Sequence, residues 1–165
     1  MTRAVTPEAG AAIVASHPPA LQAARQALVF SLEGQRYALL LEQVQEIQHI
    51  VELSEVCSDD GPLVGVLNLR GAIVPAVDAR SAIGLPRAEY TLETPMIVCL
   101  SRGESVALIV DRVHDVIDTP AERVQDPPLL RALGSRLAGA FATDDGLVYL
   151  LDADAMLGEL AAVGD

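Results

Sequence analysis

The stretch that decides the fold is "GVLNLRGAIVPAVDAR", residues 65–80. Two apolar runs flank a polar turn, NLRG at 68–71, and a glycine turn between Val-rich runs is typical of a β-hairpin. Arginine carries five donors and stays charged, so a partly buried Arg70 must find a carboxylate or several carbonyls. Glu46 is the partner that we predict, and an exposed hairpin arginine is an alternative of equal weight.

The same device recurs along the chain: an apolar run, a glycine turn and a second apolar run. The four turns are centred on Gly34, Gly71, Gly103 and Gly146. Tight hairpins need positive φ, which glycine adopts without steric cost, so the repeated pattern predicts a mainly antiparallel β protein. From the residues alone, two small barrels and one large barrel are both compatible with this pattern.

The helical signals are short. "LEQVQEI" at 41–47 has apolar residues at helical spacing and predicts one or two turns. Thr119 and Glu122 have the spacing of a capping box around Pro120, and Asp152 is a candidate N-cap for a C-terminal helix that ends near Leu160. We therefore expect short helices and one C-terminal helix on a β scaffold.

Composition shifts suggest the domain boundaries. Residues 1–24 are rich in Ala and Pro and lack a strand pattern, which predicts a flexible N-terminal tail. Loops with Pro, Asp and Gly are expected at 57–62 and 126–135, but neither is long enough to separate domains. We expect residues 25–162 to form a single domain.

The charge balance excludes several functions. Twenty-three acidic and eleven basic residues give a net charge of -12, which repels nucleic-acid phosphates and anionic membranes. We therefore predict no nucleic-acid partner and no direct membrane insertion. All eleven basic residues are arginine, so a phosphate-loop lysine and a Schiff-base lysine are excluded.

The cysteines and the N-terminus indicate a compartment. Cys57 and Cys99 lie far apart, and Cys99 stands in the apolar run "MIVCL", a context typical of a reduced, buried thiol. The N-terminal apolar piece "AAIVA" at 11–15 is too short for a signal peptide or a membrane span. These features predict a cytoplasmic protein in a reducing environment.

The best candidate for chemistry is "DRVHDVID", residues 111–118, which holds three carboxylates and an imidazole. A small metal-dependent hydrolase using Asp111, His114 and Asp115 is thus one hypothesis. An extended chain would point His114 and Asp118 away from the other two acids, so solvated acidic residues near a turn are the favoured interpretation. Without a nucleophile motif we predict no enzyme, no metal and no cofactor.

At this point the residues resemble a family. "GVLNLRGAIVPAVDAR" followed by "SAIGL" is similar to the central signature of CheW-like adaptor domains. "LVFSLEGQRYALLLEQVQEI" at 28–47 resembles the first hairpin and helical turn of that family, and "VALIVDRVHDVID" at 106–118 resembles its later strand pair. The resemblance extends over about residues 28–158.

The resemblance implies two small five-stranded SH3-like β-barrels that share a hydrophobic core. It also implies a non-catalytic coupling protein of chemotaxis signal transduction, which binds the regulatory domain of a CheA-type histidine kinase and the cytoplasmic tip of a methyl-accepting chemoreceptor. The groove between the barrels would bind the receptor. The positions that match this partner-binding surface are Val44, Glu46, Ile47, Gly65, Asn68, Arg70, Pro95 and Met96. Structural roles would fall to Gly71, Pro75 and Asp78.

Some residues depart from the family pattern. Ala79 stands where a leucine is usual, and Pro95 replaces a branched residue. An adaptor of another chemosensory pathway, for surface motility or second-messenger output, is therefore an alternative. A further alternative is a structural or inhibitory decoy that has lost one partner.

Overall fold

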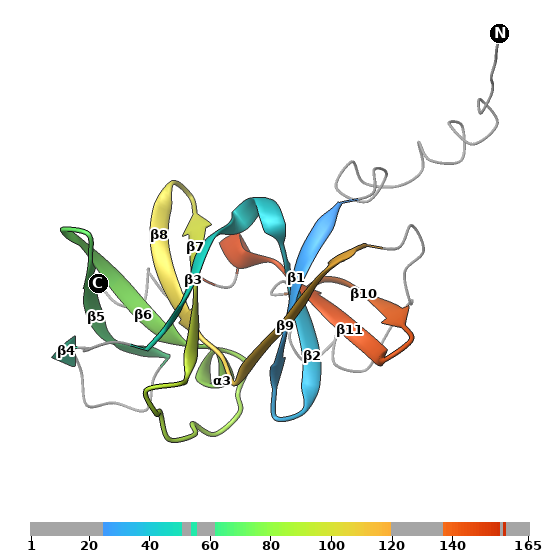
Figure 1. Ribbon diagram of the computed structural model, residues 1–165, viewed down its shortest axis with the longest axis horizontal. Helices are drawn as coiled ribbons and strands as arrows, with labels where there is room; N and C mark the ends of the chain where they lie inside the picture. The colour runs from blue at the N-terminus through green and yellow to red at the C-terminus, as the bar shows by residue number, and fades with distance from the viewer. Residues whose placement is uncertain (1–24, 51–53, 56–61, 120–136, 156, 158–165) are drawn as a thin grey trace, which may run out of the picture.

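The computed structural model describes residues 25–50, 54–55, 62–119, 137–155 and 157. Their strands form two bodies that lie side by side (Figure 1). The first barrel has the strand order β10-β11-β2-β1-β9. Its strands are β1 (Gln26–Leu32), β2 (Gln35–Leu40), β9 (Arg112–Asp118), β10 (Leu137–Thr143) and β11 (Gly146–Leu151).

The second barrel has the strand order β3-β7-β8-β6-β5-β4. Its strands are β3 (Val44–His49), β4 (Ser54–Glu55), β5 (Leu63–Leu69), β6 (Ala72–Asp78), β7 (Pro95–Ser101) and β8 (Glu104–Ile109). The predicted mainly β fold with two sheets is confirmed. The second sheet has five long strands and, in addition, the two-residue strand β4.

The glycine turns form hairpins at all four predicted places. Three loops of two residues have positive φ at both positions: Glu33-Gly34, Arg70-Gly71 and Arg102-Gly103. This geometry matches the twist of the flanking strands, and at the second position glycine adopts it without strain. In the fourth hairpin Thr143 pairs with Gly146, so the glycine begins β11 and the loop is 144–145.

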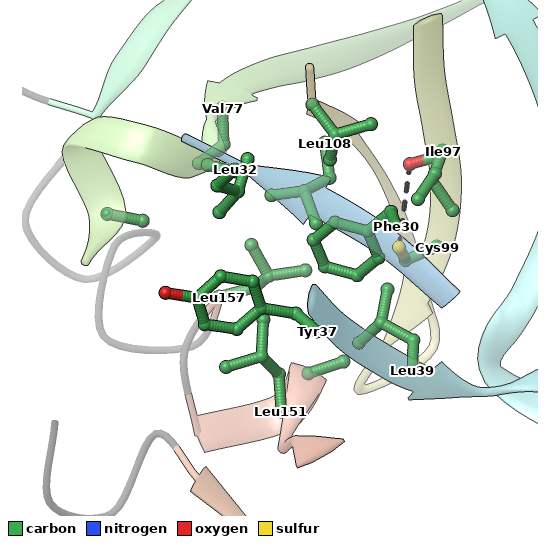
Figure 2. Close-up of a cluster of buried hydrophobic side chains, with 14 of the residues drawn as sticks. Phe30, Leu32, Tyr37, Leu39, Val77, Ile97, Cys99, Leu108, Leu151 and Leu157 are labelled. Atoms are coloured by element: carbon green, nitrogen blue, oxygen red, sulfur yellow. Dashed lines mark hydrogen bonds between the residues drawn. The ribbon is translucent and has the colours of Figure 1, made fainter. Parts of the chain in front are cut away.

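Three apolar clusters explain why the strands read as continuous hydrophobic runs. One cluster lies inside the first barrel and includes Val29 and Phe141, and another lies inside the second barrel and includes Val98. The third is shared: Figure 2 shows side chains of both barrels, among them Phe30 and Leu108, pointing toward one another. Strands at this junction are buried on both faces, so polar residues do not alternate along them.

Cys99 lies in the shared core, where it is a free and fully buried thiol. Burial raises its pKa to about 12, because the thiolate would be poorly solvated there. The expectation of a reduced Cys99 agrees with this environment. Cys57 lies outside the described residues.

The predicted helix over 41–47 is wrong beyond its first residues. A 3₁₀ turn, η1 (Leu41–Gln43), is followed at once by β3. The physical reason is pairing with β7, in which Ile47 lies opposite Ile97 and the side chains alternate between more and less exposed. Tertiary pairing thus overrides a local helical pattern.

The other helical predictions have mixed outcomes. The short helix α3 (Ala79–Ala82) follows β6. Residues 153–155 are helical, and Asp152 Oδ1 accepts a hydrogen bond from the Ala155 backbone N–H at 3.1 Å, which confirms the predicted cap. The capping-box helix after Thr119 and the loop at 126–135 lie outside the described residues, as does most of the loop at 57–62. No helix in the described ranges is long and apolar enough to cross a membrane.

Candidate interaction surface

An ion pair joins two distant strands of the second barrel. Arg70 Nη1 and Nη2 donate to the two carboxylate oxygens of Glu46 at 2.6 and 2.8 Å. Glu46 lies on β3, whereas Arg70 lies in the β5–β6 turn, and three strands separate β3 from β5 in the sheet order. The contact requires a sheet that curls round on itself, so the pair closes the seam of the barrel.

The prediction that Arg70 binds Glu46 is confirmed, and Arg70 is exposed as well. Its side chain retains 72% of its accessible surface, against 23% for Glu46. Hydrogen bonds from Arg70 and then from Gln48 hold the pKa of Glu46 below its usual value. The guanidinium is therefore oriented by a shielded carboxylate and still faces solvent.

The turn that carries Arg70 is held by its own residues. Arg70 has a φ of 54°, a left-handed conformation that is unfavourable for a residue with a Cβ. Asn68 Oδ1 accepts a hydrogen bond from the Gly71 backbone N–H at 2.9 Å, which stabilises this turn. Gly71 itself has a φ of 88°, so its predicted structural role has a clear backbone reason.

A groove lies between the two barrels. Its walls come from Ile47 and His49 on β3, from Pro95 at the start of β7, and from Arg112 and Val113 on β9, and its volume is about 440 Å³. Ile47 is 47% exposed although it is a large apolar side chain. Such a concave surface with apolar and charged walls is suited to binding a protein partner.

The predicted partner-binding residues lie in one barrel but at different depths. Surface positions are occupied by Glu46, Ile47, Asn68, Arg70 and Pro95. Met96 is fully buried in the core of the second barrel, Gly65 is buried, and Val44 packs against the shared core. The prediction that Met96 contacts a partner directly is therefore wrong. Its side chain lies in the core and can only support the groove wall from behind.

Asp78 and Pro75 serve the fold of the central motif. Asp78 is 2% exposed, and its Oδ1 accepts a hydrogen bond from the Ser81 backbone N–H at 3.0 Å, which caps α3. Its Oδ2 accepts a hydrogen bond from the Tyr90 hydroxyl. Burial first, and this hydrogen bond second, raise the pKa of Tyr90. Pro75 of β6 lies opposite Val66 of β5. It directly precedes the three β6 residues that pair with β8.

Tyr90 and the pairing of Arg80 were missed by sequence reasoning. Arg80 donates to Asp111 with Nε and Nη2 at 2.8 and 2.6 Å. The only local signal was the position of Arg80 two residues after Asp78, in the helical turn that Asp78 caps. No spacing rule, however, connects residue 80 with residue 111.

The acidic stretch 111–118 does not form a metal site. Asp111 is bound to Arg80, whereas His114 Nε2 lies 3.1 Å from Ser31 Oγ on β1. A β-bulge places residues 114 and 115 opposite a single residue of β1, and Asp115 is exposed. Among the described residues no three metal-ligating side chains come together. The geometry therefore contradicts the grouping that a metal-dependent hydrolase would need.

Comparison with known proteins gives consistent matches. The family described as "CheW-like domain" matches residues 26–161. "Chemotaxis protein CheW" of Bacillus subtilis is 30% identical over 132 residues, which is 79% of this chain and 85% of the relative. "Probable chemotaxis protein CheW" of Rhizobium etli is 28% identical, over 84% of this chain and 90% of the relative.

A solved structure has the same arrangement of barrels. It is the crystal structure of scaffolding protein TtCheW from Thermoanaerobacter tengcongensis, with a TM-score of 0.72 and 25% sequence identity. The match covers 81% of this chain and 92% of that chain. Together with the family match, this fold defines a protein of the two-barrel CheW-like class. The chain belongs to the CheW-like domain family.

Proposed function

We propose that this chemotaxis adaptor binds the regulatory domain of a CheA-type histidine kinase and the cytoplasmic tip of a chemoreceptor. It acts in the cytoplasm and catalyses no reaction. The chemotaxis names of the relatives and the scaffolding role printed for the solved neighbour support this proposal. The adaptor unit is residues 25–162. Neither interaction needs residues 1–24.

The observation that carries the proposal is the groove with its exposed apolar wall, on a barrel that also carries an oriented, exposed arginine. Ile47 and Pro95 form apolar parts of one wall, and Arg70 stands on the same barrel, held by Glu46. Exposed apolar surface and a preoriented guanidinium are the side-chain types that dominate protein-binding hot spots. We assign the groove to the receptor tip.

The predicted site residues take two roles in this proposal. Ile47, Asn68, Arg70 and Pro95 contact partners, while Glu46 orients Arg70. Support from behind comes from Val44, Gly65 and Met96, which are buried or packed against a core. This division predicts that surface changes reduce binding with little loss of stability, whereas changes at the supporting positions reduce both.

Calorimetric titration tests the proposal directly. The full chain is titrated with the kinase regulatory domain and, separately, with a receptor-tip fragment. Ile47→Asp should lower affinity for the receptor tip at least about tenfold, because it places a charge in an apolar contact. Leu100→Asp is the matched control, since Leu100 is also an exposed apolar residue of the second barrel but does not line the groove. Absence of binding to both partners would refute the proposal.

Pro95 favours a second candidate, an adaptor of another chemosensory pathway. It lies in the groove wall at a position where the resemblance implies a branched residue. Titration with receptor tips from a flagellar pathway and from surface-motility or second-messenger pathways of the same organism separates the candidates. Binding to both kinase and receptor of any pathway would exclude a decoy.

A further inference from the structure

A second ion-pair cluster lies away from Glu46 and Arg70. Arg80 Nε and Nη2 donate to Asp111 Oδ1 and Oδ2 at 2.8 and 2.6 Å. Asp111 Oδ2 also accepts a hydrogen bond from the Glu33 backbone N–H at 2.8 Å, and Arg80 Nη1 lies 3.3 Å from Glu33 Oε2. We call these three residues the inter-barrel clamp.

The clamp connects the two barrels. Glu33 lies in the β1–β2 turn of the first barrel, and Arg80 lies in α3, which follows β6 of the second barrel. Asp111 stands between β8 and β9, where the chain passes from the second barrel to the first (Figure 1). This crossing segment is hydrogen-bonded to both barrels. The Val110 backbone N–H donates to the Pro95 carbonyl oxygen of the second barrel at 3.2 Å, and the Asp111 backbone N–H donates to the Ser31 carbonyl oxygen of the first barrel at 3.3 Å.

The same crossing forms part of the groove. Asp111 and the two residues after it line one side, and Ile47 and Pro95 line the other. A rotation of one barrel against the other at this crossing would change the separation of the two walls. The residues that hold Asp111 therefore hold part of one groove wall.

The apolar contacts between the barrels constrain this angle less sharply than directional hydrogen bonds do. Hydrophobic burial is non-directional, and the shared core consists almost entirely of aliphatic and aromatic side chains. A fork of two parallel hydrogen bonds from guanidinium to carboxylate, in contrast, constrains orientation. Desolvation raises the pKa of Asp111, but the hydrogen bonds from Arg80 and Glu33 outweigh it and hold that pKa below its usual value. The fork is charged at neutral pH.

We propose that the inter-barrel clamp fixes the orientation of the two barrels and so holds the groove in its binding shape. Arg80 is a positioning residue: it does not line the groove but acts through Asp111. The orientation of the barrels is a property of the protein alone. The consequence for receptor affinity rests on the proposed function.

The orientation is measured by the distance between two spin labels, one on each barrel. Ile73→Cys labels the second barrel and Asp144→Cys the first, at positions that are both exposed. Cys57 is replaced by serine, and Cys99 stays because it is fully buried. Arg80→Met should broaden the distance distribution, and Arg80→Lys, which keeps the charge but loses the fork, should also broaden it. Arg102→Met removes an arginine charge from the β7–β8 turn and should leave it unchanged.

A distribution for Arg80→Met and Arg80→Lys as narrow as that of the parent protein would overturn the proposal. Receptor-tip affinity is then titrated with the same variants. If the binding-competent orientation falls to a tenth of the population, the apparent Kd rises about tenfold. Broadening shows that the clamp sets the orientation whether or not the receptor binds. A parent protein that binds no receptor tip refutes the proposed function, not the clamp.

Discussion

Replacement of Asp78 by alanine should destabilise the protein substantially, because one buried carboxylate holds both α3 and the loop residue Tyr90. Oδ1 caps α3 through the Ser81 backbone N–H, and Oδ2 accepts the hydrogen bond of the Tyr90 hydroxyl. Asp78 is only 2% exposed, so water does not easily replace either contact. Both contacts are lost in Asp78→Ala.

The magnitude follows from these two contacts. Loss of an N-cap side chain costs about 1 kcal/mol of stability. Loss of the hydrogen bond from the Tyr90 hydroxyl lowers the free energy of unfolding by roughly 1 to 2 kcal/mol more. This is the lower end of the usual range, because Tyr90 is only half-buried and water can reach its hydroxyl. The expected sum is about 2 to 3 kcal/mol.

Urea unfolding followed by far-ultraviolet circular dichroism measures this loss. With slopes of about 2 kcal/mol per molar urea, the midpoint should fall by about 1 to 1.5 M. Tyr90→Phe should remove only the hydroxyl contribution, and the double variant should show coupling between the two positions. A loss below about 0.5 kcal/mol for Asp78→Ala, or fully additive effects, would refute the assigned roles.

Four further outcomes are expected. Arg70→Glu should weaken partner binding about tenfold or more, since it removes the exposed guanidinium and places two carboxylates together; Glu46→Gln, which keeps one hydrogen-bond acceptor, should have a smaller effect in the same titration. Cys99 should resist iodoacetamide at pH 8 until urea unfolds the chain, because its pKa is about 12 and it is buried; mass spectrometry of the folded protein checks this. The folded-state pKa of Asp111 is lowered, so its stabilising contribution is complete above the ordinary value of 3.8 and is lost as pH falls below it; Asp111→Asn should flatten this part of a stability–pH curve. Truncation after Ala24 should leave the affinity for both partners unchanged, and a loss of affinity would show that the tail takes part.

The hairpins could be predicted because their determinants are local. A two-residue loop with positive φ needs glycine at its second position, and that requirement is visible in the chain at Gly34, Gly71 and Gly103. The pairing of Arg70 with Glu46 was one of two predictions of equal weight: a partly buried guanidinium needs an acceptor, whereas an exposed hairpin arginine does not. The resemblance to the family added the two-barrel arrangement.

Two features could not be predicted in this way. Residues 44–47 have a helical pattern, but pairing with β7 makes them a strand, and no local signal encodes that partner. The depth of Met96 was likewise hidden, since a residue on a buried strand faces a core on either side. Both errors come from contacts between segments that lie far apart along the chain.

The sequence by itself determined the β class, the hairpin turns, the anionic surface and the exclusion of lysine chemistry, because each depends on residue type or on neighbours within a few positions. Only the tertiary structure decided that β3 is a strand, that Asp111 pairs with Arg80 instead of binding a metal, and that a groove lies between the barrels. These features arise where segments far apart along the chain meet. Such contacts depend on long-range packing and charge pairing, which no short window of the chain contains.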